Sequence, residues 1–430
     1  MNTFTSMGVR PRMLAALERA KITTPLQIQI ETIPLLMQGR DAVVEAPTGS
    51  GKTLAFLIPL VERLGGHQAH RRPRALIVAP SRELAVQIAT VLKTLDSGLR
   101  VAIIHGGVGY GGQLSALRAS ADVVVGCPGR VLDLVNQGAL QLGEVQFLVL
   151  DEADEMLDAG FAPDVERILA RTPGANSPQR RQTVLTSATI PSWVQTMIAK
   201  HLVDPARVTV AAGSEPRLDH AILQMERPRK VNILSDVLKR HGGRAIVFHR
   251  TKHGAKKLSS DLTKLGHRTV ELQGNLSQNA RDRAINAFRS GQADVLVATN
   301  VAARGIDVSN VGVVVNYELP ETPQWLTHRI GRTARNGAEG RALTFLTPED
   351  HDQWRKLRRL GAPDLRVGDT SHLLATGELR YLAGPVAIAD TSYPRGPRPA
   401  GPSPNRPGQF SARRRRSRPT AMRAREQGAS

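Results

Sequence analysis

The chain has 430 residues and a formal net charge of +20, which predicts two or three domains and a polyanionic partner, with nucleic acid first and an acidic membrane surface second. Its single cysteine, Cys127, excludes an internal disulfide and a multi-cysteine metal site. The chain start lacks the apolar stretch of a signal peptide and no run is long enough to span a bilayer, so we expect a cytoplasmic protein without membrane contact.

The first half of the chain alternates apolar runs with helix-length segments. In order, the runs are DAVVEA, ALIVAP, VAIIH, DVVVG, FLVL, TVLTS and VTV. Continuous apolar runs that are each followed by a helical segment are typical of buried parallel strands. Residues 1–212 are therefore predicted to form an α/β domain with a doubly wound parallel sheet.

The first run leads into APTGSGKT, residues 46–53, and then into a helical pattern. Glycines let successive backbone N–H groups curl around phosphate oxygens, and the next helix presents its positive end. This is a Walker A loop with Ala46 in place of the first glycine, and its position between strand and helix disfavours a chance turn. Lys52 is expected to contact the terminal phosphates and Thr53 to bind Mg²⁺. The residues expected to contact the nucleotide here are Ala46, Thr48, Gly49, Ser50, Gly51, Lys52 and Thr53.

An acidic cluster, Asp151-Glu152-Ala153-Asp154, follows the run FLVL. Ligands of parallel α/β sheets bind at the carboxyl ends of the strands. Asp151 is the expected Mg²⁺ partner, and Glu152 is placed to deprotonate the water that attacks the terminal phosphate. Acidic residues also open helices for purely structural reasons, but the P-loop upstream favours the catalytic interpretation.

A second set of apolar runs follows a polar break near residues 211–219. These runs are AIVF, TVEL, DVLVAT, VVVNY and ALTFL. They predict a second doubly wound domain at residues 221–362, joined to the first by a linker at 213–220. Residues 363–389 show no clear period and form an extension of uncertain structure.

The last part of the chain, residues 390–430, is predicted to be a disordered basic tail. Residues 391–430 hold ten Arg, seven Pro and one Glu, so they carry +9 of the total charge. With almost no large apolar side chains, this segment has too little surface to bury. Clustered Arg releases counterions from nucleic acid, so we expect an auxiliary RNA tether, with a solubilising tail as the alternative.

Taken together, these motifs resemble those of a DEAD-box ATP-dependent RNA helicase, with the family's order kept between Phe4 and Leu346. The resemblance implies two tandem RecA-like domains, ATP and Mg²⁺ as cofactors, and RNA bound through its backbone without sequence specificity. We expect a monomer.

Nucleotide contacts outside the P-loop come from this resemblance. Gln29 would hydrogen-bond the adenine edge, Phe4 would stack on the adenine ring, and Asp307 would bind the ribose. Arg332 and Arg335 lie in the segment HRIGRTAR and would be arginine fingers that stabilise charge on the γ phosphate.

The resemblance also implies RNA contacts and a coupling network. The residues expected to contact RNA are Pro80, Ser81, Arg82, Gly107, Pro128, Gly129, Arg130, Arg281 and Thr299. The residues expected to couple hydrolysis to strand separation are Asp154, Ser187, Thr189 and His328. Cys127 stands where the family has Thr, and it is either a weak thiol donor to phosphate or a small buried apolar residue.

The implied activity is local, non-processive unwinding, in which ATP closes the two domains on one bent RNA strand. Two alternatives stay open. The arginine-rich tail is also compatible with an ATP-gated RNA clamp or annealing factor. A DNA helicase is disfavoured chiefly because the motifs match an RNA family.

Overall fold

The computed structural model describes residues 3–382, except 48, 70–71, 96, 175–176, 211–217, 301, 303–310 and 335–338. The predicted tail and residues 383–389 therefore lie outside the described residues, as do Thr48, Asp307 and Arg335. The chain divides into two compact units, Met1–Ala387 and Ile388–Ser430, and every described residue belongs to the first.

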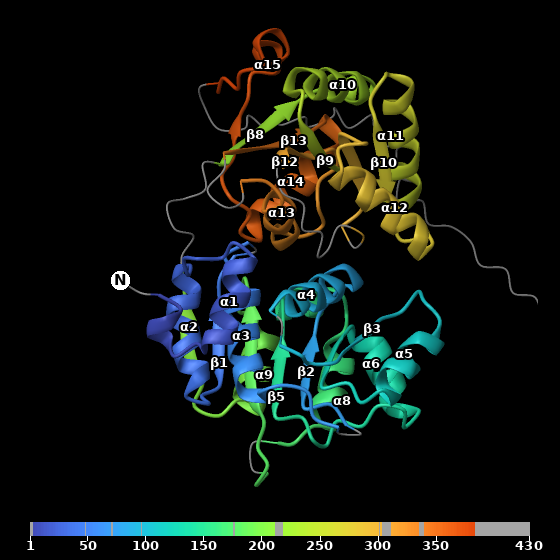
Figure 1. Cartoon of the computed structure of the whole chain (residues 1–430). Helices are drawn as coiled ribbons and strands as arrows, with labels where there is room; N and C mark the ends of the chain where they lie inside the picture. The colour runs from blue at the N-terminus through green and yellow to red at the C-terminus, as the bar shows by residue number, and fades with distance from the viewer. Residues whose placement is uncertain are drawn as a thin grey trace, which may run out of the picture. The chain divides into compact units, whose positions relative to one another are not determined.

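The described residues form two parallel seven-stranded sheets, so the predicted fold class is confirmed (Figure 1). The strands of the first sheet are β1 (Ala42–Glu45), β2 (Ala75–Val78), β3 (Val101–Ile104), β4 (Val123–Gly126), β5 (Phe147–Leu150), β6 (Gln182–Ser187) and β7 (Ala206–Thr209). Its helices are η1 (Thr5–Met7), α1 (Pro11–Arg19), α2 (Gln27–Met37), α3 (Lys52–Leu64), α4 (Arg82–Thr94), α5 (Tyr110–Arg118), α6 (Pro128–Asn136), α7 (Ala153–Asp158), α8 (Ala162–Leu169) and α9 (Ser192–His201). The sheet order is β3-β4-β2-β5-β6-β1-β7.

The second sheet repeats the pattern in the order β10-β11-β9-β12-β13-β8-β14. Its strands are β8 (Leu218–Gln224), β9 (Arg244–Phe248), β10 (Thr269–Leu272), β11 (Val295–Ala298), β12 (Val311–Asn316), β13 (Gly340–Leu346) and β14 (Arg366–Val367). Its helices are η2 (Arg227–Arg229), α10 (Lys230–His241), α11 (Lys252–Lys264), α12 (Gln278–Arg289), α13 (Pro323–Ile330), η4 (Pro348–Asp350), α14 (His351–Arg359) and α15 (Thr370–Thr376).

The continuous apolar runs arise because both faces of each sheet are covered. In β2, Ala75 and Ile77 belong to one buried cluster, while Leu76 and Val78 belong to the cluster on the opposite face. All four side chains are 0% exposed. Since successive strand residues point to opposite faces, a strand covered on both sides must be apolar at every position.

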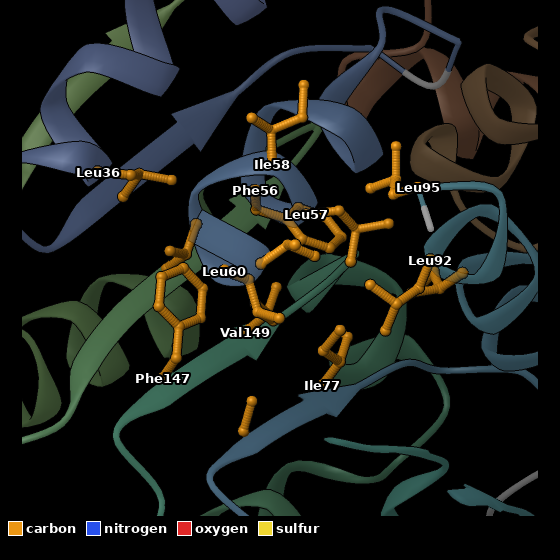
Figure 2. Close-up of a cluster of buried hydrophobic side chains, with 14 of the residues drawn as sticks. Leu36, Phe56, Leu57, Ile58, Leu60, Ile77, Leu92, Leu95, Phe147 and Val149 are labelled. Carbon is orange, nitrogen blue, oxygen red and sulfur yellow. The ribbon is translucent and has the colours of Figure 1, made fainter. Parts of the chain in front are cut away.

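One face of the first sheet is filled mainly by α3. Its side chains Phe56, Leu57 and Leu60 pack over Phe147 and Val149 of β5 (Figure 2). Phe56 is 1% exposed, and truncating such a residue to Ala typically costs about 3–5 kcal/mol of stability. This packing fixes the start of α3, and therefore the P-loop, against the carboxyl edge of the sheet.

Two boundaries differ from the sequence expectation. Residues 218–220, expected in the linker, begin β8 and pair with β13. Within the predicted extension, β14 pairs with β8, and α15 follows. A two-residue strand is too short to produce a periodic pattern, which explains why this edge of the sheet gave no signal in the sequence.

Over the part of the chain that the structure describes, no helix has the length and apolar character needed to cross a bilayer.

Candidate active site

The P-loop joins β1 to α3 at the carboxyl edge of the first sheet. Gly49 and Gly51 have φ angles of 85° and 93°, a left-handed conformation that other residues rarely adopt. A Cβ on Gly51 would lie 2.7 Å from Leu26 Cδ1 and 2.8 Å from Gln29 Nε2. Both glycines are therefore required by the turn that leads into α3, where a helix N-terminus favours anions.

Lys52 is the first residue of α3, and its side chain turns into the loop. It is 7% exposed, and its ammonium donates to the carbonyl oxygens of Ala46 and Pro47, the second at 3.0 Å. Burial lowers the pKa of Lys52, while the charge of Asp151 acts in the opposite direction. Ser50 Oγ is buried and has no hydrogen-bond partner among the described residues. A desolvated ammonium beside an unsatisfied hydroxyl fits an anionic ligand.

Gln29 makes its two side-chain hydrogen bonds inside the protein. Its Oε1 accepts from the Leu26 backbone N–H at 2.9 Å, and its Nε2 donates to the Gly51 carbonyl at 3.2 Å. The side chain thus braces the P-loop, a role that the sequence reading did not assign to it. Phe4 is 4% exposed and belongs to the apolar core, so little of its ring is open for stacking.

The acidic cluster lies at the same edge, after β5, and all its carboxylates are buried. The Asp151 carboxylate accepts a hydrogen bond from the Thr186 hydroxyl, and Thr186 Oγ1 accepts from the Glu152 N–H at 3.2 Å. Burial raises the pKa of Asp151, and the hydrogen bond from Thr186 opposes this shift. The sequence analysis did not identify Thr186 as a site residue. The one feature that could have pointed to it is its position near the carboxyl end of β6, the strand beside β5.

Glu152 combines a strained backbone with a raised pKa. It has φ 54° and ψ 57°, a left-handed conformation that costs a non-glycine residue of the order of 1–3 kcal/mol. Burial, followed by the neighbouring carboxylates of Glu155 and Asp151, raises the pKa of Glu152 to about 8. Its Oε2 is buried with no hydrogen-bond partner among the described residues. A strained carboxyl group with a raised pKa is typical of a functional site.

The residues predicted to hold Mg²⁺ are Thr53 and Asp151. Among the described residues, no group of three or more His, Cys, Asp or Glu side chains could hold a metal ion. Mg²⁺ is often held by one or two carboxylates together with substrate phosphates and water. The buried, weakly satisfied carboxylates therefore fit an ion that arrives with a nucleotide.

Asp154 is connected to the end of β6. Its Oδ2 accepts from the Thr189 N–H and from the Thr189 hydroxyl, both at 2.9 Å. Ser187 Oγ accepts from the Asp154 backbone N–H at 3.3 Å and donates to the Thr189 carbonyl at 2.6 Å. Of the Ser187 and Thr189 hydroxyls, only that of Thr189 reaches the Asp154 carboxylate.

Two side chains that follow β12 approach the acidic cluster. His328 Nδ1 lies 3.2 Å from Glu155 Oε1, and its Nε2 lies 3.9 Å from Asp154 Oδ2. Arg332 Nη2 lies 3.8 Å from the same Glu155 oxygen. Burial lowers the pKa of His328. Glu155, which the sequence analysis did not single out, therefore lies close to the predicted coupling histidine and to Arg332, one of the two predicted arginine fingers.

Many of the predicted RNA-contacting residues line one cavity of about 470 Å³. The expected residues that line it are Pro80, Ser81, Arg82, Gly129, Arg130 and Arg281. Of the other expected residues, Pro128 is buried at the start of α6, and Thr299 is 7% exposed.

The arginines of this cavity already have partners. Arg82 Nη1 donates to Gln278 at 2.9 Å and packs so tightly on Gly107 that a Cβ there would lie 1.9 Å from it. Arg281 forms an ion pair with Glu83 at 2.5 Å. Any phosphate that binds to Arg281 must therefore compete with Glu83.

Cys127 also lines this cavity, but it packs against the apolar core. The residue is 8% exposed and belongs to the core cluster. Burial raises the pKa of the Cys127 thiol to about 12, so the thiol stays protonated at neutral pH. These properties match the small buried apolar residue rather than a strong phosphate donor.

Two family models match the chain. One is the DEAD/DEAH box helicase model, at residues 26–197, and the other is the helicase conserved C-terminal domain, at residues 229–337. The DEAD-box ATP-dependent RNA helicase CshA of Geobacillus kaustophilus is 38% identical over 378 residues, which are 85% of this chain and 79% of that protein.

Other relatives are longer than this chain. DEAD-box ATP-dependent RNA helicase 53 of rice is 41% identical over 82% of this chain, but the match spans 58% of that protein. The match to the chloroplastic DEAD-box ATP-dependent RNA helicase 3B of maize covers 48% of that protein, so this chain spans about half of its length. Among solved structures, S. cerevisiae Dbp5 bound to RNA and ADP BeF3 has a TM-score of 0.74 and 29% identity, covering 87% of this chain and 98% of that one.

Proposed function

Because this chain belongs to the DEAD-box helicase family, we propose that it is an ATP-dependent RNA helicase that couples RNA-stimulated ATP hydrolysis to local, non-processive unwinding of RNA duplexes. The observation that carries this proposal is the meeting of a buried P-loop lysine and a buried carboxylate cluster at one sheet edge. Lys52 binds the terminal phosphates, for which it exchanges its contacts with the Ala46 and Pro47 carbonyls.

Hydrolysis then depends on the protonation state of the Glu152 carboxyl group. A carboxyl group with a pKa near 8 is matched to proton transfer near neutral pH, where a general base is most effective. Thr53 and Asp151 would hold Mg²⁺, which would supply positive charge to the reaction at the phosphate. Arg332 adds charge from the segment after β12, and Glu155 positions its guanidinium.

Coupling runs through Asp154. Its carboxylate accepts two hydrogen bonds from Thr189 and lies 3.9 Å from His328 Nε2. A change of charge at the phosphates therefore reaches the end of β6 and the helix α13 through one carboxylate. Because the two sheets carry different RNA-contacting residues, such a change alters how both hold one strand.

RNA is bound through its backbone. Arg82 and Arg130 line the cavity described above, and at 3% aromatic content the chain has few rings on which bases could stack. The basic tail is a further tether, because its clustered Arg neutralises phosphates whatever the base sequence.

Strand displacement tests this proposal. A short labelled strand annealed to a longer RNA is mixed with the protein, with ATP present or absent. We expect ATP-dependent release, lost in Lys52→Ala and kept in Lys93→Ala, which removes an exposed lysine of α4.

The same assay distinguishes the helicase proposal from the annealing alternative, which the arginine-rich tail favours. Pairing of complementary strands that does not need ATP, with no release of a strand when ATP is added, would contradict the helicase proposal and support the clamp or annealing factor.

A further inference from the structure

The second sheet repeats the strand order of the first, position by position. Counting strands along the chain within each sheet, both have the order third, fourth, second, fifth, sixth, first, seventh. By this correspondence β8 occupies the place of β1, and α10 occupies the place of α3. Each of these helices begins with a lysine, Lys52 in α3 and Lys230 in α10.

The two lysines share an unusual environment. Lys230 is 6% exposed, close to the 7% of Lys52. Burial lowers the pKa of Lys230, as it lowers the pKa of Lys52. Burying an ammonium is costly unless it is hydrogen-bonded or paired, so a buried lysine calls for a partner.

Lys230 has no such partner within the described part of the chain. Its ammonium lies over the Tyr317 ring, 4.5 Å from the centroid, and no hydrogen-bond acceptor reaches it. A cation–π contact contributes about 0.5–2 kcal/mol and leaves all three N–H donors unused. At the equivalent place in the first sheet, two carbonyl oxygens receive the Lys52 ammonium.

A cavity of about 300 Å³ lies in front of Lys230. Its walls come from the segments that follow four neighbouring strands, with Arg227 after β8, His249 after β9, Tyr317 after β12 and Thr347 after β13. This is the carboxyl edge of the second sheet, the side on which open α/β sheets bind their ligands. The volume is at the lower end of the range for small-molecule pockets.

The charges around this cavity are unevenly paired. Four carboxylates line it, and three of them, Asp261, Glu318 and Asp350, have partners inside the protein, while the fourth, Glu349, is exposed. Glu318 lies 3.1 Å from His249 Nδ1 and accepts from the Arg250 backbone N–H at 2.9 Å, and Asp350 accepts from Thr347 N–H at 3.1 Å and its hydroxyl at 2.8 Å. Asp261 lies 3.7 Å from Lys264.

The cationic side chains are not paired in this way. Arg227, Lys230, Arg250 and Lys257 all line the cavity, and none of their side chains forms a hydrogen bond or a close ion pair with another described residue. The donors left over therefore favour an anion that brings several acceptor oxygens.

The part of the cavity wall formed by His249 and Tyr317 is tightly packed. The His249 ring stacks on Tyr317, with centroids 5.9 Å apart. A Cβ on Gly254 would lie 1.8 Å from His249 Cε1, so only glycine at this position lets the ring pack against α11. The aromatic face that supports the Lys230 ammonium is thus fixed in place.

We propose that this cavity is a second anion site, which binds a phosphate group of a small molecule such as pyrophosphate or a nucleoside monophosphate on Lys230, with Arg227 and Lys257 at the rim. It is separate from the P-loop and does not depend on the helicase proposal. No glycine-rich loop lines this cavity among the described residues. Its adjacent carboxylates, Glu349 and Asp350, follow β13 rather than β12, which is the strand in the place of β5, so the proposal is for binding alone. A phosphate brings the acceptor oxygens that the Lys230 ammonium lacks.

Calorimetric titration of the full chain tests this proposal. Lys52→Ala is introduced first, so that the P-loop no longer contributes, and pyrophosphate, adenosine monophosphate and inorganic phosphate are titrated separately. We expect saturable binding of at least one probe, weakened tenfold or more by Lys230→Met and less by Arg227→Gln. Lys239→Met, which removes an exposed lysine from the last turn of α10, should leave the affinity unchanged.

Three results would overturn the proposal. These are the absence of saturable binding of all three probes, an affinity that Lys230→Met leaves unchanged, or tighter binding of a glutamate-rich peptide than of any phosphate probe. A thermal melt of each variant shows whether it is folded. Should Lys230→Met not fold, the exposed rim variant Arg227→Gln decides, and an unchanged affinity in that variant contradicts the site.

Discussion

The two sheets have one strand order but opposite chemistry at equivalent places. In the first sheet the Asp151 carboxylate, after β5, accepts a hydrogen bond from Thr186 of β6. In the second, Asn316 at the end of β12 donates to Thr344 of β13 at 3.0 Å. A neutral amide therefore stands where the first sheet has a buried carboxylate.

This single difference changes what each edge can hold. Asn316 Oδ1 accepts from Arg329 at 3.1 Å, so the amide binds a guanidinium of the chain itself. Asp151, raised in pKa by burial, is instead suited to a cation brought by a ligand. The comparison teaches that the fold supplies the same sheet edge twice, and that a few residues after the strands set the chemistry of each edge.

The largest expected effect comes from removing the positive charge of Arg332, which lies near the acidic cluster of the first sheet. Arg332→Ala should lower RNA-stimulated ATP turnover by roughly 10³-fold, the lower end of the range for arginine fingers. Steady-state phosphate release at saturating ATP measures this. Arg355→Ala, an exposed arginine of α14, is the matched control. A loss of less than tenfold in Arg332→Ala would contradict its assignment as an arginine finger.

A second test compares the Thr186 hydroxyl, which bonds Asp151, with the Thr344 hydroxyl, which bonds Asn316. Both side chains are 0% exposed and lose a buried hydrogen bond when replaced by Val, so each variant should be destabilised by about 1–3 kcal/mol. Only Thr186→Val removes a partner of Asp151, and we expect it to lower ATP turnover about tenfold more than Thr344→Val. Urea unfolding and ATPase assays on both variants check this. Equal turnover in the two would remove Thr186 from the site.

The tail is expected to act on affinity alone. Deleting residues 390–430 should weaken RNA binding and flatten its salt dependence, since each neutralised phosphate contributes about 0.7 to the slope for a single strand. Hydrolysis without RNA should not change. Binding titrations at several salt concentrations measure the slope, and an unaltered slope would refute the tether.

A further expected effect is a pH dependence of stability at Glu152. Its pKa is about 8 in the folded protein, above the value near 4.5 expected when unfolded. The folded state therefore binds the proton more tightly, and ionisation costs stability as the pH rises from about 4.5 to 8. Gln is neutral throughout, so Glu152→Gln should gain stability over the natural chain across this window. Unfolding at pH 5 and pH 8.5 tests this; a gain no larger at pH 8.5 would contradict the raised pKa.

Much of the fold could be predicted because strands buried on both faces need apolar residues at every position. The P-loop and the Asp-Glu-Ala-Asp segment were equally visible, since their residues are adjacent in the chain. What was missed depends on contacts between distant segments. Thr186 reaches Asp151 only because β6 lies beside β5, and Glu155 meets His328 from 173 positions away.

Gln29 shows a different limit of sequence reasoning. Its position predicted a nucleotide contact, but an amide can serve several partners. In the structure its oxygen bonds the Leu26 N–H at the start of α2, and its nitrogen bonds the Gly51 carbonyl of the P-loop. The contact with adenine stays a prediction. The choice between partners depends on distances that no motif encodes.

The most direct test of the central claim is ATP hydrolysis by Glu152→Gln, measured with and without structured RNA. If the buried carboxyl group at the edge of the first sheet performs the proton transfer, RNA will stimulate turnover in the natural chain and will fail to do so in this variant, while nucleotide binding is kept. RNA-stimulated turnover in Glu152→Gln equal to that of the natural chain would contradict the account.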